Sequence, residues 1–340
     1  MPLPFRPNCQ PTSLGLLPHA DVVPACTAML RYSSCLPTLP LLAGAGEAPE
    51  LLAADGFAGA TVGSASVTVD RHAARRGVDA LYVAYLRGAA NAQPVELATL
   101  SWMLHPDNQP LRRARGLFGL VLGPVSLGQA LVDEQADPVL NDHELVDALA
   151  KHVYLRRLWL HKQLERVTKP VIVWLYEPYL VVLESPFRPL PAEILLEAVD
   201  QALGYELLRA LWVSSAEAAL LLPESWPLDV LGMPLPMPEQ ATTVGPMIAR
   251  LVSRRTAFGW GLVPVTAEGL RGATAGRLAA RFTAWLRALE AVCIAPDAVV
   301  AASLIMPEDT LVDLDPADAE RALALTVELS SLIQQSYGVE

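Results

Sequence analysis

The sequence is short of cysteine, of basic charge and of long hydrophobic runs, and each shortage excludes a class of protein. Its 340 residues include four cysteines, with no CxxC pair and no spacing typical of a metal site. A chain this long and this poor in cysteine does not depend on a disulfide framework, so we expect a reducing, cytoplasmic compartment. No internal repeat is evident.

Basic residues are outnumbered by acidic ones, 25 to 36, which gives a formal net charge of −11. An acidic surface repels phosphate backbones and anionic lipids, so neither nucleic acid nor a membrane surface is an expected partner. The first ten residues lack the apolar stretch of a secretory signal. The most apolar runs, such as residues 171–183, are too short to span a bilayer and contain Glu177. Apolar residues make up 52% of the chain, enough for a large core.

Short apolar runs alternate with stretches of helical periodicity, which is typical of a parallel sheet made of strand–helix units. Two runs, LFGLVL at 117–122 and VIVWL at 171–175, are continuously apolar, as strands buried on both faces should be. Eight strands in this order favour an α/β fold of the closed (β/α)₈ (TIM) barrel type over an open sheet, with residues 1–340 in one domain. The predicted strands are Ser13–Leu17, Leu36–Leu42, Leu117–Leu122, Val171–Tyr176, Leu207–Val213, Leu228–Leu231, Ala257–Val263 and Val299–Leu304.

Residues 49–115 do not fit a simple strand–helix unit. Within them, Ala60–Asp70 alternates like a hairpin strand, and Asp79–Leu86 is compatible with either a strand or a helix. We therefore expect an excursion between barrel strands two and three, near one mouth of the barrel.

Two helices have readable ends. Asn141 and Glu144 form a capping-box-like start to a helix that runs to about Arg166. Asp315-Pro316 begins the last helix, because Pro suits the first helical position. Basic residues on the long helix could bind a partner, but we interpret them as a solvated face; they are Lys151, Arg156, Arg157, Lys162 and Arg166.

In parallel barrels the ligand site lies at the carboxyl ends of the strands, in the loops that follow them. The residues at the predicted strand ends are therefore candidates for a site. They include Gly15, Leu16, His19, Ser126, Tyr176, Glu177, Tyr179, Ser214, Glu308 and Asp309.

Three motifs, in order and with compatible spacing, resemble the superfamily of cobalamin-independent methionine synthase and uroporphyrinogen decarboxylase-like barrels. They are TSLGLLPH at 12–19, GPVSL at 123–127 and KPVIVWLYEPYL at 169–180. The resemblance covers roughly residues 12–337 and implies the same (β/α)₈ barrel. It also implies a site at the barrel mouth.

The resemblance implies, however, that the zinc of the methionine synthases is lost. Their His-x-Cys pair falls within Leu211–Ser215, their Glu near Leu231–Met233, and their late Cys at Asp309. Catalytic zinc needs at least three close N, S or O ligands, and only Glu308 and Asp309 remain. We expect no zinc and no other cofactor. Glu308 and Asp309 could instead bind a hard cation such as Mg²⁺, or lie solvated in an exposed loop.

The amino-acid end of the family's site is changed as well. The Gly-Ser-x-Pro-like turn becomes Gly15-Leu16-Leu17-Pro18, and the Asp-Glu-Pro turn becomes Tyr176-Glu177-Pro178. A phenol in place of a carboxylate removes the charge that a desolvated substrate ammonium requires. The decarboxylase branch needs no metal, but its paired-Arg turn is absent here, and a tetrapyrrole with many carboxylates would need several basic residues.

His19 matches the family's Leu-Pro-His and could donate a proton or orient a ligand, or make a structural hydrogen bond. Glu177 is the best general acid–base candidate, with a salt bridge or a cap on the next loop as the alternative. Tyr176 and Tyr179 could line a pocket or pack at the barrel end. Ser214 has no evident partner base, which argues against a nucleophile there.

Three functions remain open. The first, which we favour, is a barrel without zinc that binds a small apolar or amphipathic ligand at its mouth without thiol methylation. The second is a zinc-free or corrinoid-linked methyltransferase, or a lyase-type enzyme, that uses Glu177 and His19. The third is a non-catalytic interaction subunit. The expected partner is an unidentified small molecule, and assembly into a homo-oligomer stays open.

Overall fold

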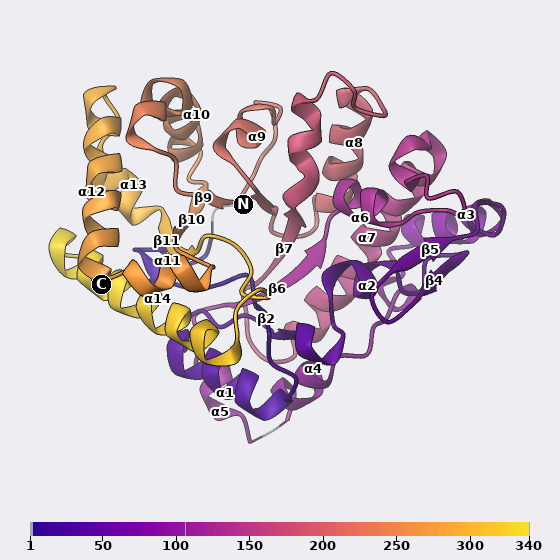
Figure 1. The fold of residues 1–340 in the computed structure, drawn as a ribbon, viewed down its shortest axis with the longest axis horizontal. Coiled ribbons are helices and arrows are strands. Elements are labelled where there is room, and N and C mark those ends of the chain that lie inside the picture. Colours follow the sequence, from indigo (N-terminus) through magenta and orange to yellow (C-terminus); the bar gives the residue numbers. More distant parts are fainter. Residues whose placement is uncertain (1–2, 106, 340) are drawn as a thin grey trace.

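The computed structural model describes residues 3–105 and 107–339 and has a curled, all-parallel sheet at its centre (Figure 1). The two runs predicted to be buried on both faces form β6 and β7, and every residue of both is buried. Continuous apolarity therefore predicted strands covered on two sides. The seven strands, in sheet order, are β1 (Gln10–Pro11), β11 (Ser303–Pro307), β10 (Ala257–Val263), β9 (Val230–Pro234), β8 (Ala210–Val213), β7 (Val171–Glu177) and β6 (Leu117–Leu122).

Two short strands, β2 (Leu16–Leu17) and β3 (Leu41–Leu42), pair in parallel beside this sheet. β2 follows β1 on the same stretch of chain, in which the amide of Thr12 donates to Ile305 O at 3.0 Å. Upstream of β3, the amide of Leu39 donates to Phe118 O at 2.8 Å. Residues 10–17 are thus hydrogen-bonded to β11, residues 37–42 to β6, and the two segments to each other.

Several predicted strand boundaries are wrong by a few residues. The strands predicted at Leu36–Leu42 and Ser13–Leu17 are reduced to Leu41–Leu42 and Leu16–Leu17. The first three residues of Val299–Leu304 belong to helix α13 (Pro296–Ala301), and β11 starts only at Ser303. The strands predicted from Leu207 and Leu228 start at Ala210 and Val230. The reason is physical: an apolar run marks burial, and burial continues from a strand into the turn or helix beside it.

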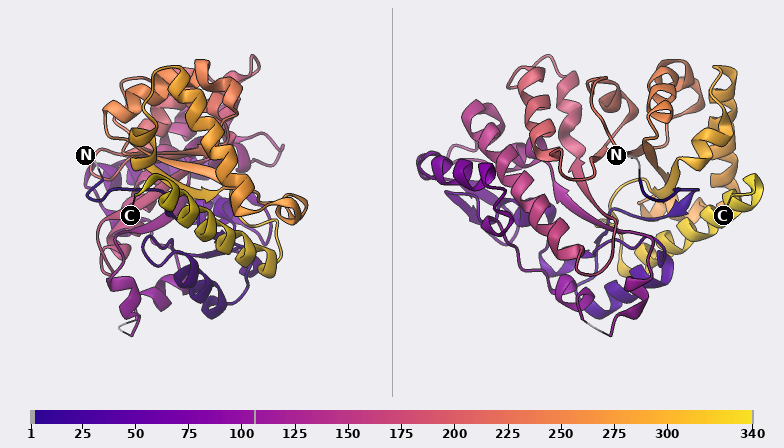
Figure 2. Two further views of the ribbon diagram at one scale, coloured as in Figure 1. Left: turned by 90° about the vertical axis from the view of Figure 1, so that its left-hand side faces the viewer. Right: turned by 180° about the vertical axis from the view of Figure 1, so that it is seen from behind.

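Helices surround the sheet, and α12 and α14 lie at the edge opposite α3 (Figures 1 and 2). Asp315 caps α14, as predicted, and accepts from the amide of Asp318 at 2.8 Å. Among the described residues, no helix is long and apolar enough to cross a membrane. The helices outside residues 49–115 are α1 (Val22–Tyr32), α6 (Pro124–Ala130), α7 (His143–Leu164), α8 (Ala192–Leu203), α9 (Ala216–Leu220), α10 (Ala241–Ser253), α11 (Ala267–Gly272), α12 (Ala275–Ala291), α13 and α14 (Pro316–Tyr337).

The long helix α7 corrects two predictions. Its N-cap is Asp142 rather than Asn141, and the carboxylate accepts from the amide of Leu145. Two residues of the supposed solvated face, Arg156 and Arg157, are buried. The guanidinium of Arg157 donates to the carbonyls of Ala202 and Leu203 at 2.8 and 2.7 Å and so caps the carboxyl end of α8. The charge of a side chain on α7 therefore did not predict that the side chain is exposed to solvent.

Residues 49–115, the segment expected to form the excursion, contain a hairpin and helices. Ala60–Val62 and Val67–Val69 pair as an antiparallel hairpin, β4–β5, and the segment 79–86, open between strand and helix, is helical. The hairpin and α3 lie together at one edge of the molecule (Figure 1). The helices of the excursion are α2 (Pro49–Ala54), α3 (Arg71–Leu86), α4 (Ala98–Met103) and α5 (Gln109–Arg112). Short 3-10 turns lie at Ala43–Ala45, Ala90–Ala92, Val139–Asn141, Pro178–Glu184 and Pro238–Gln240.

Candidate functional site

A cavity of about 590 Å³ opens at the carboxyl ends of β2, β6 and β7, and we call it the mouth pocket. Four of the predicted ligand-binding residues line it: Leu16, Ser126, Tyr176 and Tyr179. Its volume lies within the range of small-molecule sites. The other lining residues are Ala48, Pro49, Glu50, Ala65, Ser66, Val67, Thr68, Leu122, Gln129, Ala130, Val132, Pro178, Thr310 and Val312.

The mouth pocket has two walls of different origin. The strand-end wall comes from the ends of β2, β6 and β7 and from α6. The insertion wall comes from the start of α2 and from the hairpin β4–β5, and it includes Glu50, Ser66 and Thr68. None of these three side chains was predicted from the sequence. The alternation in Ala60–Asp70 signalled a hairpin, but nothing in it showed that the hairpin packs over the strand ends.

Glu177 lies at the end of β7 but does not line the mouth pocket, because its carboxylate is fully buried. Oε1 accepts from the amide of Val125 at 2.9 Å, and Oε2 accepts from the amide and hydroxyl of Ser126 at 2.9 and 2.6 Å. Burial raises the pKa of Glu177 to about 7, while these hydrogen bonds lower it. These contacts cap the start of α6, which follows β6 in the chain, rather than the loop after Glu177, and they tie β7 to α6.

Gly123 is part of the same arrangement. A Cβ built on it would lie 2.1 Å from Oε1 of Glu177, so only glycine allows the carboxylate to approach the start of α6. Ser126 connects this arrangement to the turn after β7, because its hydroxyl accepts from the amide of Tyr179 at 3.0 Å. Hydrogen bonds that run from Glu177 to Ser126 and from Ser126 to Tyr179 thus hold the strand-end wall in place.

Tyr176 and Asp309 form a pair beside the mouth pocket. The phenol donates to Oδ1 of Asp309 at 2.8 Å, and the amide of Thr310 donates to the same oxygen at 2.7 Å. Burial raises the pKa of the Asp309 carboxyl above its usual range, whereas the hydrogen bond from Tyr176 lowers it. Burial, together with the nearby negative charge of Asp309, raises the pKa of the Tyr176 phenol. The raised pKa of Tyr176 keeps its phenol neutral, so the phenol is the donor in the hydrogen bond to Asp309.

The remaining predicted residues lie outside the mouth pocket. His19 is buried, with Nε2 3.9 Å from a carboxylate oxygen of Glu320. The hydroxyl of Ser214 donates to Pro178 O at 2.9 Å, and Glu308 forms an ion pair with Arg281 at 2.8 Å. Gly15 has φ +85°, and a Cβ on it would lie 2.5 Å from a methyl carbon of Thr38, so its role in the turn is conformational.

The residues present do not fit the zinc of the methionine synthases. Across residues 3–105 and 107–339, no three His, Cys, Asp or Glu side chains are grouped as a metal site requires. At the aligned positions, Ser214 is bonded to a backbone carbonyl, Glu308 to Arg281 and Asp309 to Tyr176. The donors that remain are oxygen atoms that already have protein partners.

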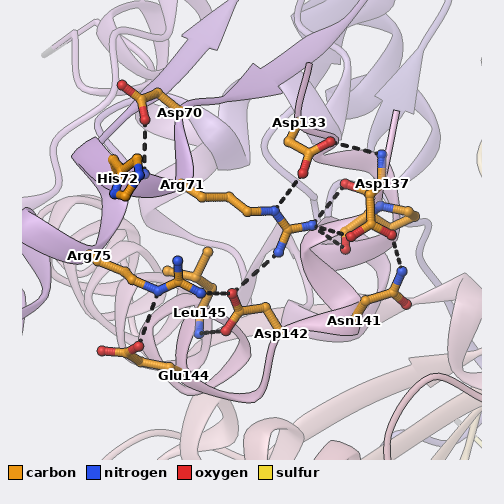
Figure 3. A network of polar contacts seen from close by, with 11 residues as sticks. Asp70, Arg71, His72, Arg75, Asp133, Asp137, Asn141, Asp142, Glu144 and Leu145 are labelled. Carbon is orange, nitrogen blue, oxygen red and sulfur yellow. Dashed lines mark hydrogen bonds and ion pairs between the residues drawn. The ribbon is translucent and has the colours of Figure 1, made fainter. Parts of the chain in front are cut away.

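An ion-pair network, which we call the Arg71 clamp, fixes the insertion wall (Figure 3). The guanidinium of Arg71, at the start of α3, lies 2.7 Å from both Asp133 and Asp137 and 3.3 Å from Asp142. Arg75 adds contacts to Asp142 and Glu144. Because α3 directly follows β5, the clamp holds the hairpin against the loop after α6.

Two other cavities are poorer candidates. A space of about 20 Å³ beside α2 holds little more than one water molecule. A hollow of about 680 Å³ lies between residues 3–7 and the amino ends of β10 and β11. Ligand sites of parallel α/β sheets lie at the carboxyl ends of the strands, so the mouth pocket is the better candidate.

Comparison with known proteins gives a likeness in structure. No family model matches the chain, and no curated protein matches it. The structure is similar to that of a B12-independent methionine synthase from Shewanella sp. in complex with selenomethionine, with TM-score 0.45 and 10% identity over 71% of this chain and 68% of that one. It is also similar to a protein from Listeria monocytogenes described as a vitamin-B12-independent methionine synthase, with TM-score 0.46 and 14% identity over 70% of each chain.

Proposed function

We propose that the chain is a (β/α)₈ barrel that binds a small, largely apolar molecule in the mouth pocket without zinc and without methylating a thiol. Closure of the barrel is supported by hydrogen bonds that continue from β11 through residues 10–17 and 37–42 to β6. Counted in this way, eight parallel stretches follow one another around the sheet, as in barrels of this type.

The observation that carries the binding proposal is the mouth pocket itself, at the end of the strands where barrels bind their ligands. Apolar side chains provide most of its lining. Hydroxyl groups of Tyr176 and Tyr179 and the amide of Gln129 lie among them. A ligand with an apolar body and one polar end would match such a surface.

An acid–base enzyme that uses Glu177 and His19 is less well supported. Both oxygens of the Glu177 carboxylate are engaged by α6, and His19 does not line the mouth pocket. A general acid or base must come within hydrogen-bond reach of its substrate. For a pure interaction subunit, on the other hand, there is no reason to keep a cavity of this size at the strand ends.

The proposal can be tested with 1-naphthalenemethanol, a fluorescent probe with an apolar body and one hydroxyl. Ala130→Trp should block binding, because Ala130 lines the mouth pocket and is exposed at the end of α6. Ala280→Trp, at an exposed position of α12 outside the pocket, is the matched control. Saturable binding that Ala130→Trp weakens at least about tenfold supports the proposal. Absence of binding, or equal binding by both variants, would contradict it.

A further inference from the structure

The charges in and beside the mouth pocket have one sign. Glu50 is the only acidic residue of its lining, and no Lys, Arg or His of the described chain lines it. Glu50 makes no ion pair within 4.0 Å among the residues described. The wall contributed by the excursion therefore presents a carboxylate without a cation.

A second carboxylate stands behind the strand-end wall. Asp309 accepts from the phenol of Tyr176 and from the amide of Thr310. Within the described residues, no basic side chain pairs with it. Ionisation of a half-buried carboxylate costs free energy when all its hydrogen-bond donors are neutral. A nearby cation would offset that free energy.

The aromatic lining favours the same kind of ligand. Tyr176 and Tyr179 both face the mouth pocket, and the ring of Tyr176 packs against that of Trp212 with centroids 4.9 Å apart. The face of an aromatic ring attracts a cation by electrostatics, most strongly when the cation is desolvated. Rings on one wall and a carboxylate on the other form a surface complementary to a positive charge.

Resting on the proposed function, we infer that the ligand of the mouth pocket is an organic cation: an amine with an apolar body and no carboxylate of its own. The amine lies between Glu50 and the Tyr176–Asp309 pair, and the apolar body lies against Leu16, Leu122 and Val132. An amino acid or another carboxylate is disfavoured, because no basic side chain of the pocket would pair with its anionic group.

The test compares three probes of one shape: 1-naphthylmethylamine, 1-naphthalenemethanol and 1-naphthoate. Each is titrated into the full chain at neutral pH and low salt, with fluorescence and calorimetry as readouts. We expect the amine to bind at least about tenfold more tightly than the alcohol, a difference of ~1.4 kcal/mol, and naphthoate to bind most weakly.

Variants then assign this preference to its source. Glu50→Gln should reduce the amine-to-alcohol ratio at least about fivefold, and Asp309→Asn should reduce it further in the double variant. Glu328→Gln, at an exposed site on α14, is the control and should leave the ratio unchanged. Circular dichroism of each variant separates a loss of folding from a loss of charge.

The outcomes distinguish this inference from the proposal on which it rests. If the alcohol binds as tightly as the amine, or if the preference survives in the double variant, the pocket binds a ligand but the inferred positive charge is wrong. If none of the three probes binds, the proposed function fails and this inference fails with it.

Discussion

The two walls of the mouth pocket are held in place by different forces. The strand-end wall is anchored by Glu177, whose buried carboxylate accepts three hydrogen bonds from Val125 and Ser126. The insertion wall is attached by the Arg71 clamp, whose side chains retain partial exposure. Removal of a buried, fully bonded carboxylate costs far more than loss of a partly exposed ion pair.

This difference has a consequence for function. A wall held by buried packing stays in place under most solution conditions, whereas a wall held by ion pairs depends on ionic strength. The strand ends should therefore form a fixed platform, and the hairpin a part that opens at lower cost.

The largest expected effect is on the strand-end wall. Glu177→Ala should lower the free energy of unfolding by ~3–5 kcal/mol, because it leaves two buried amides and one hydroxyl without an acceptor. Glu177→Gln should cost less, ~1–2 kcal/mol, since one oxygen remains to accept. Urea denaturation measures both. Glu184→Ala, exposed on the turn after β7, is the control. A loss below ~1 kcal/mol for Glu177→Ala would mean that the carboxylate does not anchor this wall.

The same residue predicts a dependence on pH. Burial raises the pKa of Glu177 in the folded chain to about 7, above its ordinary value of 4.5. A raised folded pKa gives stability that is fully present below pH 4.5 and is lost as the pH rises through 7. Relative to Glu177→Gln, which cannot titrate there, the wild type should lose up to ~3 kcal/mol between pH 4.5 and 7.5. Parallel denaturation curves test this. A constant difference across the range would show that the hydrogen bonds outweigh burial.

Much of the strand-end wall could be predicted from the sequence, because continuous apolar runs fix β6 and β7, and the ends of neighbouring parallel strands meet. From these strand ends, Leu16, Ser126, Tyr176 and Tyr179 were predicted to belong to one site. Glu50 and Thr68 could not be predicted, since the packing of residues 49–69 over the strand ends depends on contacts such as Arg71 with Asp133, 62 residues apart. Nor does periodicity reveal that Arg157 is buried, because carbonyl groups from other elements surround it.

A smaller effect is expected on the insertion wall. Arg71→Met should cost ~1–2 kcal/mol and act locally, because its partners Asp133, Asp137 and Asp142 lie at one edge of the molecule. Hydrogen–deuterium exchange should become faster in residues 60–69 and stay unchanged in β6 and β7. Salt near 1 M should have a similar effect on the wild type. Arg87→Met, at the exposed end of α3, is the control. Equal acceleration in β6 would show that the two walls unfold together.

The smallest effect is expected for Asp309→Asn. The amide oxygen can still accept from Tyr176, and the substitution removes a carboxylate that pairs with no cation among residues 3–105 and 107–339. Stability should change by less than ~1 kcal/mol, in contrast to Glu177→Gln, while the preference for an amine falls. Thermal and urea denaturation test the first part. A loss of ~3 kcal/mol would place Asp309 with Glu177 as an anchor.

Calorimetric titration of 1-naphthylmethylamine into the wild type and into Ala130→Trp, side by side, tests the central claim most directly. The account predicts a single saturable site in the wild type and at least about tenfold weaker binding when the tryptophan fills the mouth pocket. Equal binding to both chains would locate the amine elsewhere, and absence of saturable binding to the wild type would contradict a pocket for organic cations.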